Sequence, residues 1–443
     1  MSAPDIGNLS ECISDAQRAM TDRSTLAPKL PSYGQLLTRL YAAADHLPAR
    51  YQSAVVMPCL ALIQQLGPQG YPYALRDSRY APLWESALAI LHADGSFETS
   101  ATQAAQELVS DLYEGFLSEE DRRNIKPPDR SLLTPLVKWG ASSRGPYTFP
   151  LDSVTQLGLQ AAIVNLPVCN SRAGLISWPS LSHETAGHDI LTADQGLLAE
   201  LRELLRTELP RRGFADYASY FAERLDEMVA DVVGVLNLGP TAALGFIGHF
   251  RALRSLAMGS RQLSTREGSS GRYPPDVLRG FLQAHVVSLL QFDQAAQWSE
   301  TLRQEIARDL NTPLLVRGQA VEPDRARAAT CAVAELIAGA PLQSLFGHAI
   351  AEIQNWRDGD EQLTAQLRAV LISGQPLPSS YAEGFYAAHA LAAAVTGAVQ
   401  SGGNSLRLLG RLRTMLCDMH RHNPLWSVPT SAADPQRFAY RYP

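Results

Sequence analysis

Two histidines and a glutamate stand close together in the segment SHETAGHDI, residues 182–190. His183 and Glu184 are adjacent, and His188 follows five residues after His183. Imidazole nitrogens and carboxylate oxygens are common ligands of zinc, and a glutamate beside the first histidine can act as a general base. The segment therefore predicts a metal site that activates a water molecule, with His183 and His188 as ligands and Glu184 as the base.

The spacing of the two histidines constrains the helix that carries them. Histidines four residues apart share one face of an α-helix, whereas a fifth residue rotates the second side chain to roughly 140° from the first. A π-type bulge restores a common face, and Gly187 tolerates the altered backbone. We therefore expect a helix over 182–191 with a bulge near Gly187.

A second acidic segment, DEMVAD, spans residues 226–231. Glu227 and Asp231 lie one helical turn apart and therefore share a face. The apolar residues that follow, VVGVLNLGP, predict a buried helix, in which carboxylates are costly unless a cation compensates them. We predict Glu227 as the third metal ligand, with Asp231 accepting the ring N–H of one ligand histidine and Asp226 that of the other.

These segments resemble the gluzincin-type zinc metallopeptidases, which carry HExxH or HExxxH on one helix and ExxAD or a relative on the next. HETAGH is similar to the HExxGH of the dipeptidyl peptidase III family, whose zinc helix is expanded by one residue, and DEMVAD is similar to its EExxAE-like segment. EMVAD also resembles the ExxAD of the prenyl-protein-processing and heat-shock-induced membrane endopeptidases. The resemblance covers about a hundred residues, 182–279.

A third segment, YPPDVLR (residues 273–279), repeats the spacing of the His-Pro-Pro-x-x-x-Arg segment of those membrane endopeptidases, with Tyr273 in place of the histidine. The resemblance implies that Arg279 supports the carboxylates or the oxyanion, and that Tyr273 donates to the oxyanion as a phenol can. It also implies Zn²⁺ as the cofactor. The function we expect is a soluble zinc-dependent hydrolase that cleaves peptide or amide bonds, with Glu184 taking a proton from the attacking water.

Two other functions use the same residues. A set of two histidines and one carboxylate also binds non-haem iron in oxygenases. Glu184 favours hydrolysis, because an oxygenase has no general need for a carboxylate next to its first ligand. A non-catalytic helical protein with a structural metal is the third alternative, but structural zinc sites usually have four protein ligands and the sequence offers three.

Composition limits the class of protein. The chain has 443 residues, 46% of them hydrophobic and 19% charged, which excludes a disordered protein. The net charge is -6 and the sequence contains no run of like charge, so we expect no nucleic-acid partner. The longest run of low polarity, 385–399, is shorter than the roughly 20 residues of a membrane span. The five cysteines are far apart, and the N-terminus lacks a secretory signal, so we expect a cytoplasmic protein.

The hydrophobic periodicity predicts a mainly α fold: a multi-helix protein with a small β element next to a zincin-like two-helix metal site. We expect an N-terminal helical domain over 1–125, a metal-site domain over 126–298 and a C-terminal helical domain over 299–443. The expected helices before residue 299 cover 33–47, 53–66, 83–92, 100–116, 182–191, 196–208, 215–236, 241–256 and 276–291.

The remaining segments carry weaker signals. Residues 161–168 and 174–178 are the best strand candidates, and an edge there would let an extended peptide substrate add a strand. Residues 126–150 are rich in Pro, Gly and Ser and predict a boundary or a long surface connection. The polar stretch 260–271 either covers the site or is solvated. His249 is interpreted as a core residue rather than a substrate contact.

Overall fold

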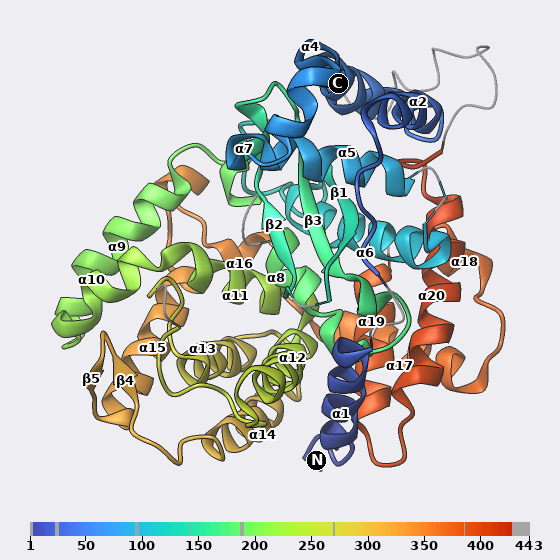
Figure 1. Cartoon of the computed structure of the whole chain (residues 1–443). Helices are drawn as coiled ribbons and strands as arrows, with labels where there is room; N and C mark the ends of the chain where they lie inside the picture. Colours follow the sequence, from blue (N-terminus) through green and yellow to red (C-terminus); the bar gives the residue numbers. More distant parts are fainter. Residues whose placement is uncertain are drawn as a thin grey trace.

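A computed structural model describes residues 3–22, 26–93, 95, 97–142, 144–186, 190–268, 271–384 and 386–427. Over these residues the protein is mainly helical, as predicted, with a three-stranded sheet near its centre (Figure 1). None of the helices in these ranges combines the length and apolar character that a membrane crossing needs.

The sheet contains β1 (Leu133–Gly140), β2 (Tyr147–Phe149) and β3 (Ala161–Pro167), in the order β1-β3-β2. β3 pairs in parallel with β1 and antiparallel with β2. The strand predicted over 161–168 is therefore confirmed, and all its residues are buried. Because β3 is the central strand, it has no free edge for a peptide, and β1 and β2 are the edge strands of the sheet.

Two of the weaker predictions were wrong. The segment 126–150 is not merely a connection, since it contains both β1 and β2. Its Pro, Gly and Ser residues lie mainly before, between and after the strands. The composition of the whole segment therefore did not indicate the short apolar run of β1. Residues 174–178 form no strand but a turn of 3₁₀-helix, Leu175–Ser177, which follows Gly174 at a φ of 74°.

A group of N-terminal helices covers one part of the sheet, above it in Figure 1. Residues of α2 (Tyr33–Ala44), α4 (Met57–Ala74) and α5 (Ala81–Ala93) form a small core with β1 and β3. α4 bends at Gly67, whose φ is 65°. The smaller elements of this part are α3 (Ala49–Tyr51), a π-helical turn (Gln52–Val56) and α7 (Leu151–Thr155).

The main core draws on the whole length of the chain. It includes Leu9, Phe221 and Leu416, one from each of the three predicted domain ranges. The division into those ranges stays a prediction. The helices outside the small core are α1 (Leu9–Thr21), α6 (Thr99–Leu117), α8 (Ser180–Ala186), α9 (Leu197–Arg211), α10 (Ala215–Glu223), α11 (Leu225–Leu238), α12 (Pro240–Met258), α13 (Asp276–Ser288), α14 (Ala295–Ala307), α15 (Pro323–Gly339), α16 (Ile350–Ile353), α17 (Asp358–Ser373), α18 (Ser379–Ala382), α19 (Ala387–Val399) and α20 (Ser405–His422), and a hairpin pairs β4 (Leu315–Val316) with β5 (Gln319–Ala320).

Two of these helices follow the sequence signals closely. α12 begins at Pro240 after Gly239, and α13 begins directly after Pro275, because a proline at a helix start has no N–H to satisfy. The single helix predicted over 215–236 is divided into α10 and α11 at Arg224. α11 is buried on all sides from Glu227 to Leu238, as its apolar sequence indicates.

Glycines let α12 lie very close to the chain that leads into α8. A Cβ at Gly245 would lie 2.3 Å from Cβ of Pro179, and a Cβ at Gly248 would lie 2.3 Å from Cγ1 of Ile176. No side chain fits at either position unless its neighbour moves. This contact fixes α12 against the segment that carries His183 and Glu184.

We predict that Gly248→Ala lowers the free energy of unfolding by about 1–3 kcal/mol, because the added methyl overpacks the contact with Ile176. Urea denaturation measures the change. Gly410→Ala is the control, since Gly410 is exposed on α20 with nothing within 4 Å of an added Cβ, and there alanine should stabilise the helix by about 0.5–1 kcal/mol. Equal effects of the two substitutions would contradict the close packing of α12.

Candidate active site

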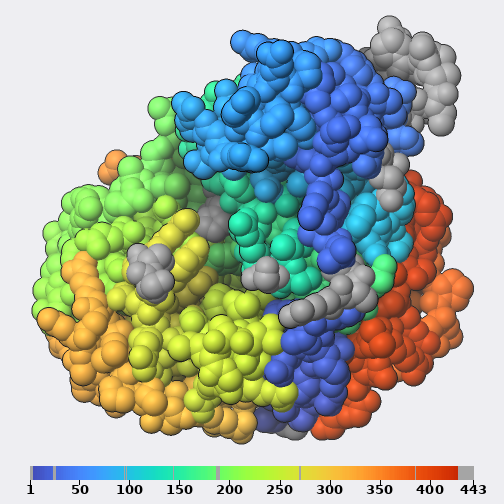
Figure 2. All heavy atoms as spheres, in the orientation of Figure 1, coloured from blue at the N-terminus to red at the C-terminus, as the bar shows by residue number. Residues whose placement is uncertain are grey.

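A cavity of about 280 Å³ lies where β2, α8, α11, α12 and the loop before α13 meet. In Figure 2 it opens as a hollow between the teal segment that carries β2 and the yellow loop after α12. The predicted residues that line it are His183, Glu184, Glu227, Asp231, Tyr273 and Arg279. Three segments that are far apart in the sequence therefore meet at one cavity.

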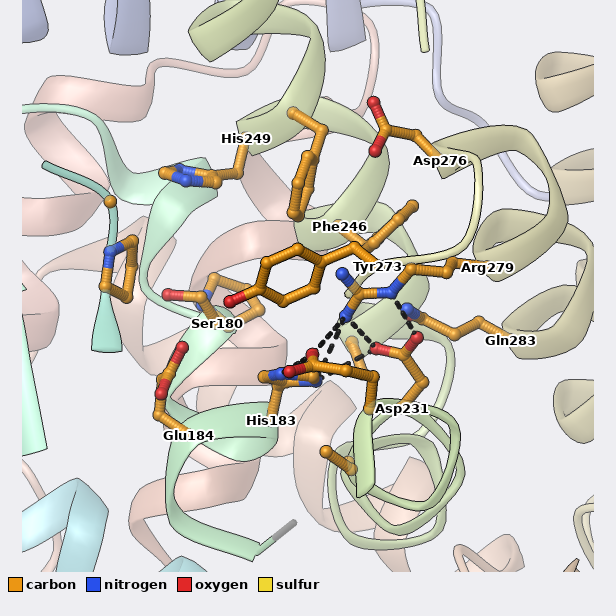
Figure 3. Close-up of a pocket in the computed structure, with 18 of the residues that line it drawn as sticks. Ser180, His183, Glu184, Asp231, Phe246, His249, Tyr273, Asp276, Arg279 and Gln283 are labelled. Atoms are coloured by element: carbon orange, nitrogen blue, oxygen red, sulfur yellow. Dashed lines mark hydrogen bonds and ion pairs between the residues drawn. The ribbon is translucent and has the colours of Figure 1, made fainter. Parts of the chain in front are cut away.

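His183 lies between the two carboxylates of α11. Its Nδ1 is 2.9 Å from Oδ1 of Asp231, and its Nε2 is 3.5 Å from Oε2 of Glu227 (Figure 3). Both carboxylates are almost fully buried, and they share a helix face as predicted. The Asp231 contact fixes the orientation of the ring and directs Nε2 toward Glu227.

The carboxylates hold a second proton on the ring of His183. Burial lowers the pKa of His183, but the hydrogen bonds to Asp231 and Glu227 outweigh burial and raise the pKa to about 10. Without a metal, the ring therefore carries protons on both nitrogens at neutral pH. A divalent cation at this position would replace the proton on Nε2.

Arg279 completes the charge network. Its Nε and Nη2 donate to the two oxygens of Asp231 at 2.7 and 2.9 Å, and Nη2 lies 3.7 Å from Oε2 of Glu227. Burial lowers the pKa of Arg279, but Asp231 more than offsets this, so the pKa is raised overall. Of the two roles implied by the resemblance, the geometry favours support of the carboxylates.

Aromatic rings surround the guanidinium group of Arg279. Its central carbon lies 5.1 Å from the ring centre of Phe246, 5.5 Å from that of Phe250 and 5.9 Å from that of Tyr273. A guanidinium is weakly hydrated and stacks well on aromatic faces, so this enclosure is favourable. The rings also keep water away from the ion pair with Asp231.

Glu184 is held by a residue that the sequence did not single out. Oγ1 of Thr148, in the middle of β2, lies 2.8 Å from Oε2 and 2.9 Å from the backbone oxygen of Glu184. The hydroxyl donates to these acceptors, so one carboxylate oxygen of Glu184 is occupied. The other oxygen, Oε1, is left to accept a proton from a molecule in the cavity.

Tyr273 projects over the cavity from the loop before α13. Figure 3 shows its phenol oxygen pointing toward Ser180 on α8. Burial raises the pKa of Tyr273, and the charges of Glu227 and Glu184 raise it further, so the phenol keeps its proton and can donate it in a hydrogen bond. The neighbouring Arg272 has its Nε 3.6 Å from Oε1 of Glu227.

The loop that carries Tyr273 is tied down on both sides. The backbone N–H groups of Leu263 and Ser264 donate to the carboxylates of Asp309 and Asp276. Nη2 of Arg224 donates to the backbone oxygen of Gly271 at 2.6 Å. Of the described residues in the stretch 260–271, Gly268 lines the cavity, so this stretch reaches the site at that residue.

One described site residue among those predicted, Asp226, lies away from the cavity. Asp226 is exposed and pairs with Arg202 at 3.4 Å, and it does not line the cavity. Neighbouring helical residues point about 100° apart, so Asp226 cannot share the face of Glu227. His188 and the bulge expected near Gly187 lie outside the described residues.

The described residues contain no group of three His, Cys, Asp or Glu side chains arranged to hold a metal ion. They do contain two of the three predicted ligands. A separation of 3.5 Å between Nε2 of His183 and Oε2 of Glu227 is close to the roughly 3.3 Å expected for two ligands about 2.0 Å from one tetrahedral ion. Asp231, on the other nitrogen of His183, matches the carboxylate–histidine pairing typical of zinc ligands.

His249 lines the cavity, although its sequence context favoured a core position. Its Nδ1 lies 3.0 Å from Oγ of Ser177, and its Nε2 faces the cavity wall at Gly145. Burial lowers the pKa of His249 to about 4, so the ring is neutral at pH 7. The helical position of His249 beside Phe246 and Phe250 is the only signal that could have assigned it to the site.

Comparisons of the chain with models of protein families, with curated proteins and with solved structures gave no match. The fold and the chemistry of the cavity therefore carry the functional conclusion. His183, Glu184, Glu227 and Asp231 are the histidine and three carboxylates of the two predicted metal-site segments that line it.

We predict that acid destabilises the protein partly through His249. Its pKa is about 4 in the folded state and about 6.5 when unfolded, so the unfolded state binds the proton first as the pH falls below 6.5. This contribution amounts to about 2–3 kcal/mol at pH 4.5 and vanishes above pH 7. Urea denaturation of the wild type and His249→Gln at pH 7.5 and 4.5 should show a smaller loss in the variant. The exposed His46→Gln is the control, and equal losses in all three proteins would contradict the prediction.

Proposed function

We propose that the protein is a zinc-dependent hydrolase that cleaves peptide or amide bonds. The observation that carries this proposal is the contact of His183 with both Glu227 and Asp231. One ring nitrogen of His183 faces a buried carboxylate of ligand type, while the other is fixed by a second carboxylate. Glu184 and the cavity lie beside this pair, and a network that only balances buried charges has no need of either.

His183 and Glu227 would hold the metal, with His188 as the third ligand predicted from the sequence. Zinc bound there supplies a Lewis acid and a water molecule whose pKa falls toward about 7. Asp231 keeps the Nδ1 proton of His183 in place and so leaves Nε2 for the metal. Arg279 neutralises the second negative charge of the pair, which makes two adjacent buried carboxylates tolerable.

Glu184 is the proposed general base. Thr148 binds its Oε2, so Oε1 is the oxygen that takes the proton from the attacking water and later passes it to the leaving amine. Tyr273, which lines the same cavity, would donate a hydrogen bond to the developing oxyanion. A single donor of this kind typically contributes about 3 kcal/mol of barrier lowering.

The neighbourhood of Glu184 also bears on the rival functions. The glutamate is held by Thr148 at the cavity and is not used in an ion pair within the described residues. A dioxygen-activating iron site needs no base at this point, and a purely structural metal needs no cavity beside it. A hydrolase uses both features.

Metal content and turnover test the proposal together. We predict that the purified protein binds about one zinc per chain by elemental analysis, and that His183→Gln and Glu227→Gln lose the metal. Glu184→Gln should keep the zinc and lower the turnover of a fluorogenic peptide library by about 10²–10⁴-fold, the usual contribution of a general base.

Asp226→Asn is the matched control, because Asp226 is an exposed carboxylate on the same helix as Glu227. It should retain both zinc and activity. Iron in place of zinc would favour the oxygenase, and zinc retained without any hydrolysis in the wild type would favour the structural role. Either result would contradict the proposed function.

The role of Thr148 gives a further prediction. Thr148→Val keeps the shape of the side chain but removes the hydroxyl that holds Glu184, so kcat should fall about 10-fold, as expected for one hydrogen bond to a charged group. KM and zinc content should stay the same. Thr148→Ser should restore most of kcat, and Thr155→Val, an exposed threonine on α7, is the control. Equal activity of the valine and serine variants would contradict a positioning role.

A further inference from the structure

One face of α12 lies at the edge of the main core, where Ala242 and Phe246 belong to the core and also line the cavity. Ala242, Phe246, His249, Phe250 and Leu253 are spaced four, three, one and three residues apart, so they lie along a single helix face. All five line the cavity. Apart from His249, this face is apolar, and an apolar face turned toward a cavity is typical of a ligand site.

The aromatic part of this face lies next to the proposed metal ligands. The ring centres of Phe246 and Phe250 are 4.5 Å apart, and both rings pack on the guanidinium group of Arg279. Nη2 of that group is 3.7 Å from Oε2 of Glu227. The aromatic pair is therefore separated from a metal ligand by only one guanidinium group.

Two arginines near this face are already paired with carboxylates. Arg254 donates to both oxygens of Asp276 at 2.8 and 3.2 Å, and Arg279 is bound to Asp231. Neither cation is therefore available as the main partner of a charged terminus of a substrate. His249 is neutral at pH 7 because burial lowers its pKa. The chemistry of the face thus suits an uncharged, apolar group.

The size of the cavity and the rigidity of its wall limit what fits. Its volume of about 280 Å³ lies just below the roughly 300–1,000 Å³ typical of ligand pockets. Gly245 and Gly248 hold α12 against Pro179 and Ile176, so this wall cannot move away without breaking a close contact. One large side chain fits such a space better than several.

We propose that the α12 face formed by Ala242, Phe246, Phe250 and Leu253 is the subsite for an aromatic side chain next to the bond that is cleaved. This inference rests on the proposed function and specifies its substrate class. The substrate is a peptide or amide that carries a bulky aromatic group adjoining the scissile bond. The rings of Phe246 and Phe250 bind that aromatic group. The proposed metal ligands His183 and Glu227 lie beside the backbone of the substrate.

Two hydroxamates test the subsite without an activity assay. Acetohydroxamate probes the metal alone, and a hydroxamate with a benzyl group beside the metal-binding group probes the metal and the subsite. Calorimetry on the zinc-loaded full chain should give a dissociation constant about 10- to 100-fold lower for the benzyl compound, which is the effect of burying one such side chain.

Substitutions on α12 test whether the preference for the benzyl compound arises at this subsite. Ala242→Leu fills the subsite and should reduce the preference for the benzyl compound to less than about 3-fold while acetohydroxamate binds as before. Phe250→Ala removes one wall and should reduce the preference to the same extent. Phe250→Leu is a milder second variant in case the alanine variant is unstable. Leu256→Ala is the matched control, since Leu256 is exposed on the same helix outside the cavity, and it should keep the full preference.

The outcomes separate the two proposals. Binding of zinc and acetohydroxamate without any preference for the benzyl compound would overturn the subsite and leave the hydrolase in place. A preference that survives both Ala242→Leu and Phe250→Leu would also overturn it. A wild-type protein that binds neither zinc nor acetohydroxamate would overturn the proposed function, and the subsite with it.

Discussion

The buried carboxylate of Asp231 joins three separate segments of the chain. It lies on α11, accepts hydrogen bonds from His183 on α8 and binds two nitrogens of Arg279 on α13. Burial raises the pKa of Asp231, but Arg279 and His183 outweigh it, so the pKa is lowered and the carboxylate stays ionised. An unpaired charge at this depth would cost several kcal/mol, so the three helices are held in the one arrangement that pairs it.

The part of the site that depends on helix periodicity could be predicted from the sequence. Glu227 and Asp231 share a face because they are four residues apart, and their apolar surroundings imply burial. A buried pair of acids needs cations or a metal, which points to the nearby histidine segment. The mainly α fold follows from the same periodicity, repeated along most of the chain.

The rest depends on contacts between segments that carry no local signal. Thr148 belongs to a strand of three residues, and its contact with Glu184 exists only because β2 pairs with β3 at a particular register. The apolar face of α12 looks like any core helix in sequence, because periodicity shows that a face is apolar but not whether it meets protein or a cavity. The role predicted for Asp226 rested on its position next to Glu227 in the sequence. Adjacent residues of a helix point in directions about 100° apart, so the two side chains do not share a face.

Helices from both ends of the described chain support the walls of the cavity. α1 packs on α12 and on the turn 175–177, while α20 packs on α6, which in turn packs on α8. Since α20 follows every element that carries a site residue, these walls are complete only when α20 has packed on α6. The burial of Glu227, Asp231 and Arg279 is therefore a property of the whole fold and not of the segments that carry them.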